Sequence, residues 1–373
     1  MIDLLLKLGG TQGALFAILL LAKRPVRKSN VTLAVLMFFI GIASLFVAFE
    51  SLDLYLKFPI LIRLNWGLPL LFGPLFYIYI LYLVKPGYRL KPNDLWHFAP
   101  YIINLIILMP FLASSSEYKI QMLDYFTAIP TKGNDKYLPY FYLVQLFTGL
   151  QTIYYFTHAK RDLKNYQKDL KNEFSDIEKR KKDWLQFILI GFGVVFFINL
   201  LIVLLNTQDI YPALNYTPYF YLALFILVYL VSYKVLADSN ITSWDNVPVQ
   251  TEVVSIDFGG LPGNISAYME ENRPYLDQKL TASQLAKDLD LSRHQLSEVL
   301  SGHFNTNFYD FINAYRVEEF KKLLQQENSS HLSLLGIAYD SGFNSKTTFN
   351  TVFKSLAGMT PSQYKKHLES KKN

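Results

Sequence analysis

The sequence predicts an all-helical protein in two parts: a polytopic bundle of seven transmembrane helices, followed by a helical domain with two helix-turn-helix units joined by a long helix. Two observations predict this division. Apolar runs, uncharged except for Lys7 in the first, recur seven times before residue 235, and each is close to the roughly 20 residues that span a bilayer. Beyond that point the apolar residues recur with the period of helices that bury one face. We therefore divide the chain into a transmembrane domain (1–236), a linker (237–263) and a helical domain (264–373).

The seven runs are apolar on all faces. A soluble helix would carry a polar stripe, so seven buried helices of a soluble protein explain these runs poorly. The first run lacks a preceding basic stretch and a small-residue cleavage site, which favours a retained span over a signal peptide. The expected spans are approximately 4–22, 31–49, 64–84, 95–113, 138–159, 184–206 and 211–233.

The basic residues between the spans predict their orientation. The connections after spans one, three and five carry sixteen Lys and Arg residues, and the other connections carry four. Because basic residues concentrate in cytoplasmic loops, we expect the N-terminus to lie outside and everything beyond Lys234 to lie in the cytoplasm. Residues 264–373 carry 13 basic and 12 acidic residues. The basic excess of the chain therefore belongs mainly to its apolar part.

A few polar side chains lie inside the expected spans, where they are costly and are candidates for function. Most are amides, and no span holds a carboxylate at mid-depth, so the sequence gives little support for a proton relay. They could bind a signal within the membrane, or they could form hydrogen bonds between helices. The candidates for signal sensing are Arg63, Asn65, Asn104, Gln145, Gln151 and Asn199.

Two stretches connect the apolar runs to the rest of the chain. Residues 160–183 mix both charge signs at helical spacing, so we expect spans five and six to continue into the cytoplasm as helices. That face could be solvated, or it could touch the C-terminal domain or anionic lipid. Residues 237–263 contain several Gly and Pro residues without a sustained period, which is typical of a linker.

The C-terminal domain repeats one pattern. In the second copy Ser333 can cap a short helix, Gly342 stands in the turn, and Ser345 can cap a helix with an apolar face. The first copy matches it at an offset of 53 residues, from Ser292 onward, while the earlier alanines differ by 52. We therefore expect a second turn that is one residue longer. A helix of about 308–326 should join the two units.

A single capped helix pair is a weak sign of a helix-turn-helix, but a duplicated pair in register is a strong one. The alternative is a small helical bundle that binds protein. The two copies also resemble the DNA-binding domain of AraC/XylS-type bacterial transcription regulators over 280–366. The matching segments are LTASQLAKDLDLSRHQLSEVL, NFYDFINAYRVEEFKKLL and IAYDSGFNSKTTFNTVFKSLAGMTPSQYKK.

The resemblance implies two recognition helices in successive major grooves, about 34 Å apart along the DNA. Three positions depart from the family pattern. Asn305 replaces a glycine, which matters little because Asn tolerates a left-handed backbone. Thr351 replaces a frequent arginine, and Lys365 replaces another while keeping its charge.

Arg293 could pair with guanine, and Gln295 or Asn350 with adenine, through two hydrogen bonds each. Other side chains would contact bases or phosphates, and the caps place helix N-termini where they could hold phosphates. With a net charge near zero, the domain should bind non-specific DNA only weakly. The expected DNA-binding residues are Ser292, Arg293, His294, Gln295, Ser297, Glu298, Ser345, Lys346, Thr347, Thr348, Asn350, Thr351 and Lys354.

Together these observations favour a one-component transcription regulator in the bacterial inner membrane, with promoter DNA, the bilayer and an unidentified signal molecule as partners and a homodimer as an option. The signal would alter packing among the spans. No cysteine, catalytic motif or paired metal-ligand spacing occurs, so we expect neither an enzyme nor a cofactor or metal site. The alternative is a membrane receptor or transporter whose helical tail binds a protein. Proteolysis in the linker could also release the DNA-binding domain.

Overall fold

The computed structural model of the chain describes residues 2–23, 25–49, 52–85, 87–121, 138–177, 182–207, 217–237, 260–326 and 333–372. Every named element in these ranges is helical. The chain forms two compact units. Unit 1 comprises Met1–Leu163 with Asp183–Trp244, and unit 2 comprises Lys164–Lys182 with Asp245–Asn373. The expected all-helical fold is confirmed.

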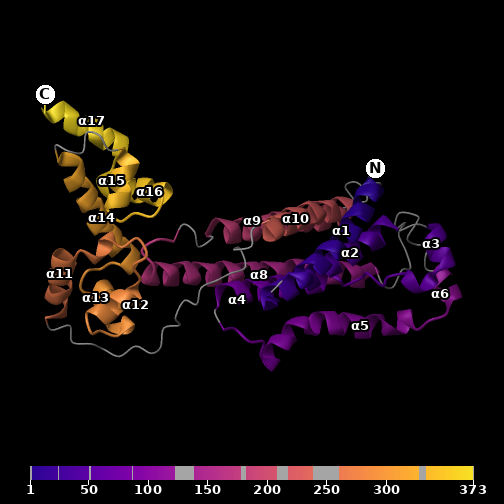
Figure 1. The fold of residues 1–373 in the computed structure, drawn as a ribbon. Helices are drawn as coiled ribbons and strands as arrows, with labels where there is room; N and C mark the ends of the chain where they lie inside the picture. Colours follow the sequence, from indigo (N-terminus) through magenta and orange to yellow (C-terminus); the bar gives the residue numbers. More distant parts are fainter. Residues whose placement is uncertain are drawn as a thin grey trace. The chain divides into compact units, whose positions relative to one another are not determined.

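The described residues of unit 1 form long helices together with several short ones (Figure 1). Its elements are α1 (Ile2–Ala22), α2 (Lys28–Ala48), α3 (Leu52–Lys57), η1 (Pro59–Leu61), α4 (Pro69–Val84), η2 (Pro92–Phe98), α5 (Ala99–Leu112), α6 (Ser116–Gln121), the first part of α8 (Leu138–Glu173), α9 (Lys182–Thr207) and α10 (Thr217–Ala237).

Four stretches of the described residues are long and apolar enough to cross a membrane, judged by length and composition: Leu4–Ala22, Lys28–Ala48, Pro92–Leu112 and Pro218–Val235. Two further apolar helical stretches are shorter, Pro69–Val84 and Gln186–Leu201. The structure therefore supports apolar helices where the sequence predicts spans, but it identifies four candidates rather than seven.

Small residues bring the first two helices into close contact. A Cβ atom added to Gly13 would lie 2.9 Å from the carbonyl oxygen of Met37, and one added to Gly41 would lie 2.8 Å from that of Gly10. Glycine at these positions lets the two backbones approach closely, as in many helix pairs within membranes. Helix α10 packs against both α1 and α2.

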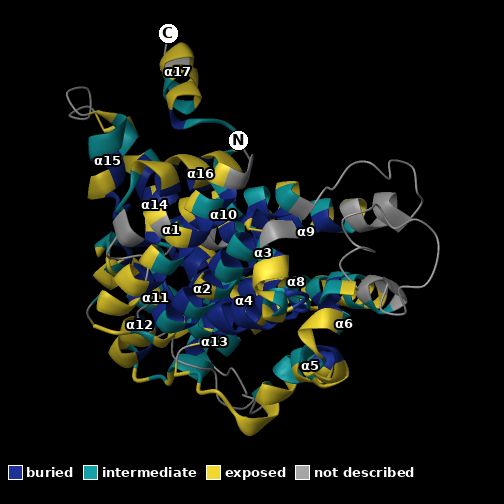
Figure 2. Cartoon of the chain, turned by 90° about the vertical axis from the view of Figure 1, so that its right-hand side faces the viewer, coloured by how far each residue is buried: buried dark blue, intermediate teal, exposed yellow. Residues whose placement is uncertain are grey.

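The third expected span begins later than the sequence suggested. Residues 62–68 form turns, and Arg63 and Gly67 have positive φ angles of 63° and 88°. A left-handed residue interrupts the i to i−4 hydrogen-bond pattern, so α4 starts only at Pro69. Figure 2 shows α4 almost wholly buried and α5 largely exposed. The start of the seventh expected span, 211–216, lies outside the described residues.

Helix α8 confirms that span five continues as a helix beyond its apolar part. It runs without interruption for 36 residues and ends at Glu173, although the expected span ended at residue 159. Its last turns belong to unit 2. The expected continuation of span six includes residues 178–181, which lie outside the described part of the chain.

The described residues of unit 2 form seven further helices and one short turn of helix besides the end of α8. They are α11 (Leu261–Asn272), η4 (Pro274–Leu276), α12 (Ala282–Asp288), α13 (Arg293–Gly302), α14 (Phe308–Gln325), α15 (Leu334–Asp340), α16 (Lys346–Ala357) and α17 (Pro361–Lys372). We call the pair α12 and α13 module 1, and the pair α15 and α16 module 2. Helix α14 joins them, as expected.

Each module has its own hydrophobic core. Leu285, Leu296 and Val299 lie in the first core and are fully buried. Phe343, Phe349 and Phe353 lie in the second. Helix α14 contributes to both cores.

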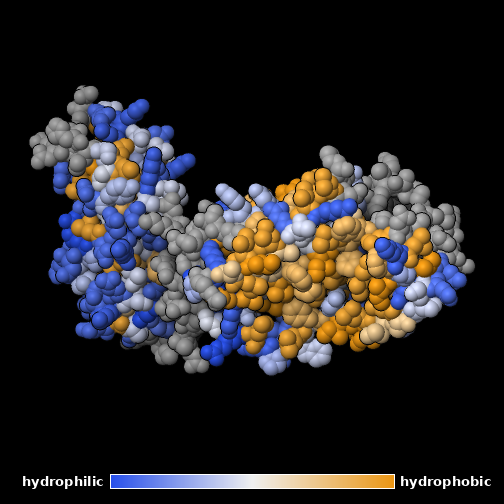
Figure 3. Space-filling model, turned by 45° about the vertical axis from the view of Figure 1, so that its right-hand side comes forward, coloured by the Kyte–Doolittle hydropathy of each residue, from blue (hydrophilic) through white to orange (hydrophobic). Residues whose placement is uncertain are grey.

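The surfaces of the two units differ in kind. In Figure 3 hydrophobic side chains cover much of the visible face of unit 1, whereas hydrophilic side chains dominate that of unit 2. Exposed apolar residues of unit 1 include Ile18 at 64% and Ile106 at 63% exposure. Such contiguous apolar surface is unusual for a soluble monomer and marks an interaction site for lipid or protein.

Candidate nucleic-acid interface

Both modules are built from capped helices, as the sequence predicts. In module 1 the Ser292 hydroxyl accepts from the Gln295 backbone N–H at 3.2 Å, and the Gln295 side chain accepts from the Ser292 N–H at 2.8 Å. In module 2 the Ser345 hydroxyl accepts from the Thr348 N–H at 3.1 Å. These bonds satisfy N–H groups that a helix start would otherwise leave unpaired.

The two turns differ by one residue, as expected: residues 289–292 join α12 to α13, and residues 341–345 join α15 to α16. Each uses a left-handed residue. Asp290 has φ 55° in the first turn, and Gly342 has φ 91° in the second. A Cβ atom at Gly342 would lie 2.3 Å from the carbonyl oxygen of Tyr275, so this position requires glycine. Asn305 also adopts a left-handed φ, 49°.

The apolar face of each recognition helix is fixed against its core. In α13 Leu296, Val299 and Leu300 are at most 1% exposed. In α16 Phe349, Val352 and Phe353 are at most 7% exposed. Because these residues recur at i, i+3 and i+4, the opposite face of each helix must point away from the core.

In module 2 that opposite face is open. Most of the expected DNA-binding residues of α16 are exposed: Lys346, Thr347, Asn350, Thr351 and Lys354. Ser345 is half-buried because it forms the cap. Thr348 is only 5% exposed, and its hydroxyl donates to a carboxylate oxygen of Asp176 at 3.2 Å. Thr348 therefore does not lie with the exposed set.

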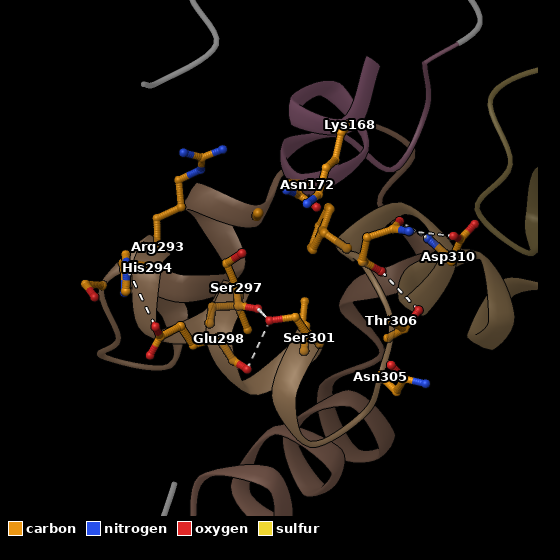
Figure 4. A pocket seen from close by; sticks show the side chains of 16 residues that line it. Lys168, Asn172, Arg293, His294, Ser297, Glu298, Ser301, Asn305, Thr306 and Asp310 are labelled. Carbon is orange, nitrogen blue, oxygen red and sulfur yellow. Dashed lines mark hydrogen bonds and ion pairs between the residues drawn. The ribbon is translucent and has the colours of Figure 1, made fainter. Parts of the chain in front are cut away.

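In module 1 the corresponding face is partly covered. Ser292 is exposed, but Arg293, His294, Gln295, Ser297 and Glu298 are half-buried. All of these residues except Gln295 line a cleft of about 750 Å³ whose other walls include Lys168 and Asn172 of α8 (Figure 4). The structure thus brings the expected residues of α13 together, next to a helix that the sequence did not assign to this site.

Arg293 makes a specific contact there. Its Nε donates to a carboxylate oxygen of Glu173, the last residue of α8, and the Arg293 side chain is 17% exposed. The other carboxylate oxygen of Glu173 accepts from the Ser283 hydroxyl at 2.7 Å. The guanidinium expected to read guanine is therefore engaged by a carboxylate of the same chain.

A buried arginine lies between the modules. Arg316 of α14 is fully buried, and it donates to the carbonyl oxygens of Tyr275 and Asp277, each at 2.8 Å. It also donates to the Ser175 hydroxyl at 3.2 Å. Burial lowers the pKa of Arg316 to about 10, because loss of water disfavours the charged form.

Sequence reasoning missed Arg316, Glu173, Ser175 and Asp176. A signal existed for Arg316, because it stands at i+4 from Ile312 and i−4 from Phe320 on the buried stripe of α14. A charged residue at such a position indicates a buried polar partner. The three residues at the end of α8 carry no comparable signal, since their partners lie more than 100 positions away.

Two of the six polar candidates in the expected spans donate a hydrogen bond to the backbone of another segment. Asn104 donates to the carbonyl oxygen of Trp66 at 3.1 Å and accepts from the Tyr140 hydroxyl at 2.7 Å. Gln151 donates to the carbonyl oxygen of Leu70 at 3.2 Å. Such bonds between segments distant in the chain are those that a structural role requires.

The other candidates of this group differ in burial and contacts. The Arg63 guanidinium lies 4.5 Å from the ring centre of Phe111 and is 3% exposed. Asn199 is buried, whereas Asn65 and Gln145 are half-buried. Within the part of the chain that the structure describes, no three His, Asp or Glu side chains converge as metal ligands would.

Comparisons with known proteins agree with this geometry. Residues 285–367 match a family model described as a helix-turn-helix domain. The chain is 31% identical over 104 residues to the HTH-type transcriptional regulator GlxA of Rhizobium meliloti, covering 28% of this chain and 31% of that protein. It is 29% identical over 90 residues to the melibiose operon regulatory protein of Escherichia coli K12, covering 24% of this chain and 29% of that one.

The raffinose operon transcriptional regulatory protein RafR of Pediococcus pentosaceus is 29% identical over 102 residues, 27% of this chain and 35% of its own length. The chain thus spans about a third of the length of these curated relatives. No solved structure matches. The C-terminal domain is an AraC-type helix-turn-helix domain with AraC-family regulators as homologues, which supports a DNA-binding transcription regulator.

Proposed function

We propose that this protein is a membrane-bound, sequence-specific transcription regulator that couples a membrane or envelope signal to promoter binding. One observation carries the proposal: two capped recognition helices, each fixed on a separate core and joined by one helix, in a domain whose homologues are transcriptional regulators. A protein of this class acts by binding duplex DNA and not as an enzyme.

The two recognition helices would enter successive major grooves of one operator. Arg293 would donate two hydrogen bonds to guanine O6 and N7, and Asn350 would pair with adenine. Gln295 is less available for a base, because its side-chain oxygen caps α13. Lys346 and Lys354 are exposed on α16 and would contact phosphates, together with the N-terminus of the helix.

Seven crossings, with the N-terminus outside and the DNA-binding domain in the cytoplasm, complete the proposal. The four apolar helical stretches and two shorter ones support part of this count, and the first half of α8 would supply the seventh crossing. The basic residues of the connections support the orientation. The partners would be the bilayer, promoter DNA, an unidentified signal molecule and, as an option, a second copy of the chain.

A selection experiment tests the DNA-binding function. The full-length protein, purified and placed in lipid nanodiscs, is mixed with random-sequence duplex DNA, and bound duplexes are enriched over several rounds. We expect a two-part motif with its halves about one helical turn, or 10 base pairs, apart. If no sequence is enriched above an empty-nanodisc control, the result favours the alternative that the helical domain binds a protein.

Single cysteines test the orientation, because the natural chain has none. Ser370→Cys places a thiol in α17, and Ser115→Cys places one in the connection expected outside; both positions are exposed. In intact spheroplasts a membrane-impermeant maleimide should label the second variant, and should label the first only after lysis. Labelling of Ser370→Cys in intact spheroplasts would contradict the proposed topology.

A further inference from the structure

The end of α8 and the residues after it form a segment that is seated on the DNA-binding domain. We call residues 171–177 the α8 tip. It lies in unit 2 with the two modules, although it is more than 80 residues from α11 in the chain. Three sets of contacts hold it, from the backbone at the start of module 1, from helix α14 and from the two recognition helices.

The backbone of the tip is paired with the start of module 1. Phe174 forms an isolated antiparallel bridge with Thr281, the residue that caps α12. The Ser175 hydroxyl donates to the carbonyl oxygen of Leu280 at 2.9 Å. Ser175 is 1% exposed and Glu173 3%, so the tip is enclosed and not merely adjacent.

Helix α14 holds the same segment from the other side. Asn313 donates to the carbonyl oxygen of Ser175 at 3.0 Å, and Arg316 donates to the Ser175 hydroxyl at 3.2 Å. Lys171 lies 3.7 Å from a carboxylate oxygen of Asp310. Ile177 packs against the core of module 2. The tip therefore supplies part of the hydrogen bonding that the buried side chains of Asn313 and Arg316 require.

Two carboxylates of the tip then reach the two recognition helices. Glu173 accepts from Arg293 at the start of α13, and Asp176 accepts from Thr348 in the first turn of α16. At Arg293, DNA would present acceptor groups, namely guanine oxygen and nitrogen atoms or phosphate oxygens. The tip supplies acceptors of the same chemistry.

We propose that the α8 tip is an intramolecular ligand of the DNA-binding domain and competes with DNA for Arg293. This inference rests on the proposed function. The Nε–H of Arg293 that donates to Glu173 is not available to guanine, and the ion pair holds a side chain that is only 17% exposed, so full contact with guanine requires Arg293 to leave Glu173. In addition, the carboxylates of Glu173 and Asp176 lie beside both recognition helices, where they repel the phosphates of an approaching duplex.

The competition makes the tip a device for transmitting a signal. Helix α8 carries span five at its other end in the proposed topology, so a change in that span alters the free energy of seating the tip. By linkage, two free energies are equal: the one by which the bound tip weakens DNA binding, and the one by which bound DNA weakens the binding of the tip. A coupling of this kind corresponds to about 5- to 150-fold in affinity.

The first test removes the acceptor charge. In the full-length protein in nanodiscs, Glu173→Gln should bind the selected operator about tenfold more tightly than the natural chain, within the range of known couplings. The matched control is Glu271→Gln, which removes one negative charge at the exposed end of α11 and should leave affinity nearly unchanged. If the tip served only to stabilise the domain, Glu173→Gln would weaken binding instead.

The second test fixes the α8 tip in its bound position with a disulfide. Residues opposite each other in an antiparallel bridge have Cα atoms about 4.5–5.5 Å apart, within the range that a disulfide can join. The natural chain contains no cysteine, so the double variant Phe174→Cys/Thr281→Cys can form only this disulfide within one chain. We expect the oxidised form to bind the operator more weakly than the reduced form of the same protein. Equal affinity in both forms, once mass spectrometry confirms the disulfide, overturns the competition.

The outcomes separate the two proposals. If the natural chain selects an operator but Glu173→Gln binds it no better, the competition is wrong and the regulator function stands. If neither the natural chain nor any variant selects a duplex, the regulator function fails and the competition fails with it. Tighter binding by Glu173→Gln together with weaker binding by the locked form supports both.

Discussion

The two helix-turn-helix modules share one plan but differ in what surrounds them. Each has a serine cap, a left-handed residue in the turn and an apolar face at the same spacing. Yet α16 exposes its outer face, whereas the outer face of α13 lines a cleft. The first residue of α13, Arg293, is also ion-paired with Glu173. The local motif thus sets the shape of a recognition helix, and distant segments set its availability.

The cores of the modules differ as well. The core of module 1 is mainly aliphatic around α12 and α13. That of module 2 is aromatic: the rings of Phe320 and Phe349 lie 4.7 Å apart, and those of Phe343 and Phe349 5.2 Å. Aromatic pairs contribute about 0.5–1.5 kcal/mol beyond the burial of their area. Module 2 should therefore be the more rigid of the two.

The largest effect is expected from Arg316→Ala, which tests whether the modules share one structural link. The substitution leaves a cavity, removes the Arg316 donor from the carbonyl oxygen of Tyr275, and removes one of the two donors to that of Asp277. We expect a loss of stability on the order of 4 kcal/mol, measured by hydrogen exchange in the full-length protein as faster exchange in both α13 and α16. The control Lys321→Ala removes a partly exposed ion pair and should cost less than about 1 kcal/mol. Faster hydrogen exchange in only one module would show that Arg316 does not link the two modules.

A smaller effect separates base reading from phosphate contact in the two modules. Arg293→Ala should weaken operator binding by about 1–3 kcal/mol and relax the preference at one base pair. Lys346→Ala should weaken binding to all sequences alike and lower the salt dependence by about one counterion. Electrophoretic shifts at several salt concentrations measure both effects.

The tip complicates the first of these substitutions, because Arg293→Ala also frees Glu173. The measurement is therefore made in the natural chain and in Glu173→Gln, as a double-mutant cycle. We expect the loss on removing Arg293 to be larger in the Glu173→Gln background. Identical losses in both backgrounds would show that the ion pair has no influence on DNA binding.

The smallest effect concerns the caps. Ser345→Ala and Ser292→Ala should each cost about 1 kcal/mol of helix stability, read as faster hydrogen exchange in the first turn of α16 and of α13. The loss should be smaller at Ser292, because alanine keeps the backbone N–H that donates to the Gln295 side chain and half of the capping box remains. Equal losses would indicate that the capping box adds nothing to a single cap here.

Much of the C-terminal domain could be predicted from the sequence, because its signals are local. A cap, a turn residue and the apolar spacing of α13 or α16 all fall within about 15 neighbouring positions. The unequal turns were predicted by comparing the two copies and are confirmed. The left-handed φ of Asn305 agrees with the resemblance, in which a glycine stands at this position. In unit 1 the third expected span was predicted to start before α4 does. Arg63 and Gly67 adopt left-handed φ angles, and the apolar character of the stretch gives no sign of them.

The covering of module 1 could not be predicted. Glu173 and Arg293 are separated by 120 positions, and nothing in a mixed-charge stretch distinguishes a docked carboxylate from a solvated one. The expectation that 160–183 is a helix was correct through Glu173, and contact with the C-terminal domain was one of several options. Only the three-dimensional contacts, which no short stretch of the sequence encodes, distinguish these options.

The separation of the two cores has an evolutionary consequence. A substitution on the outer face of α16 disturbs neither the packing around Leu296 nor that around Leu285, because these residues belong to the other core. Descendants could therefore exchange the preferred bases of one half-operator while the other half stays recognisable, so that a promoter network could be rewired in small, individually viable steps.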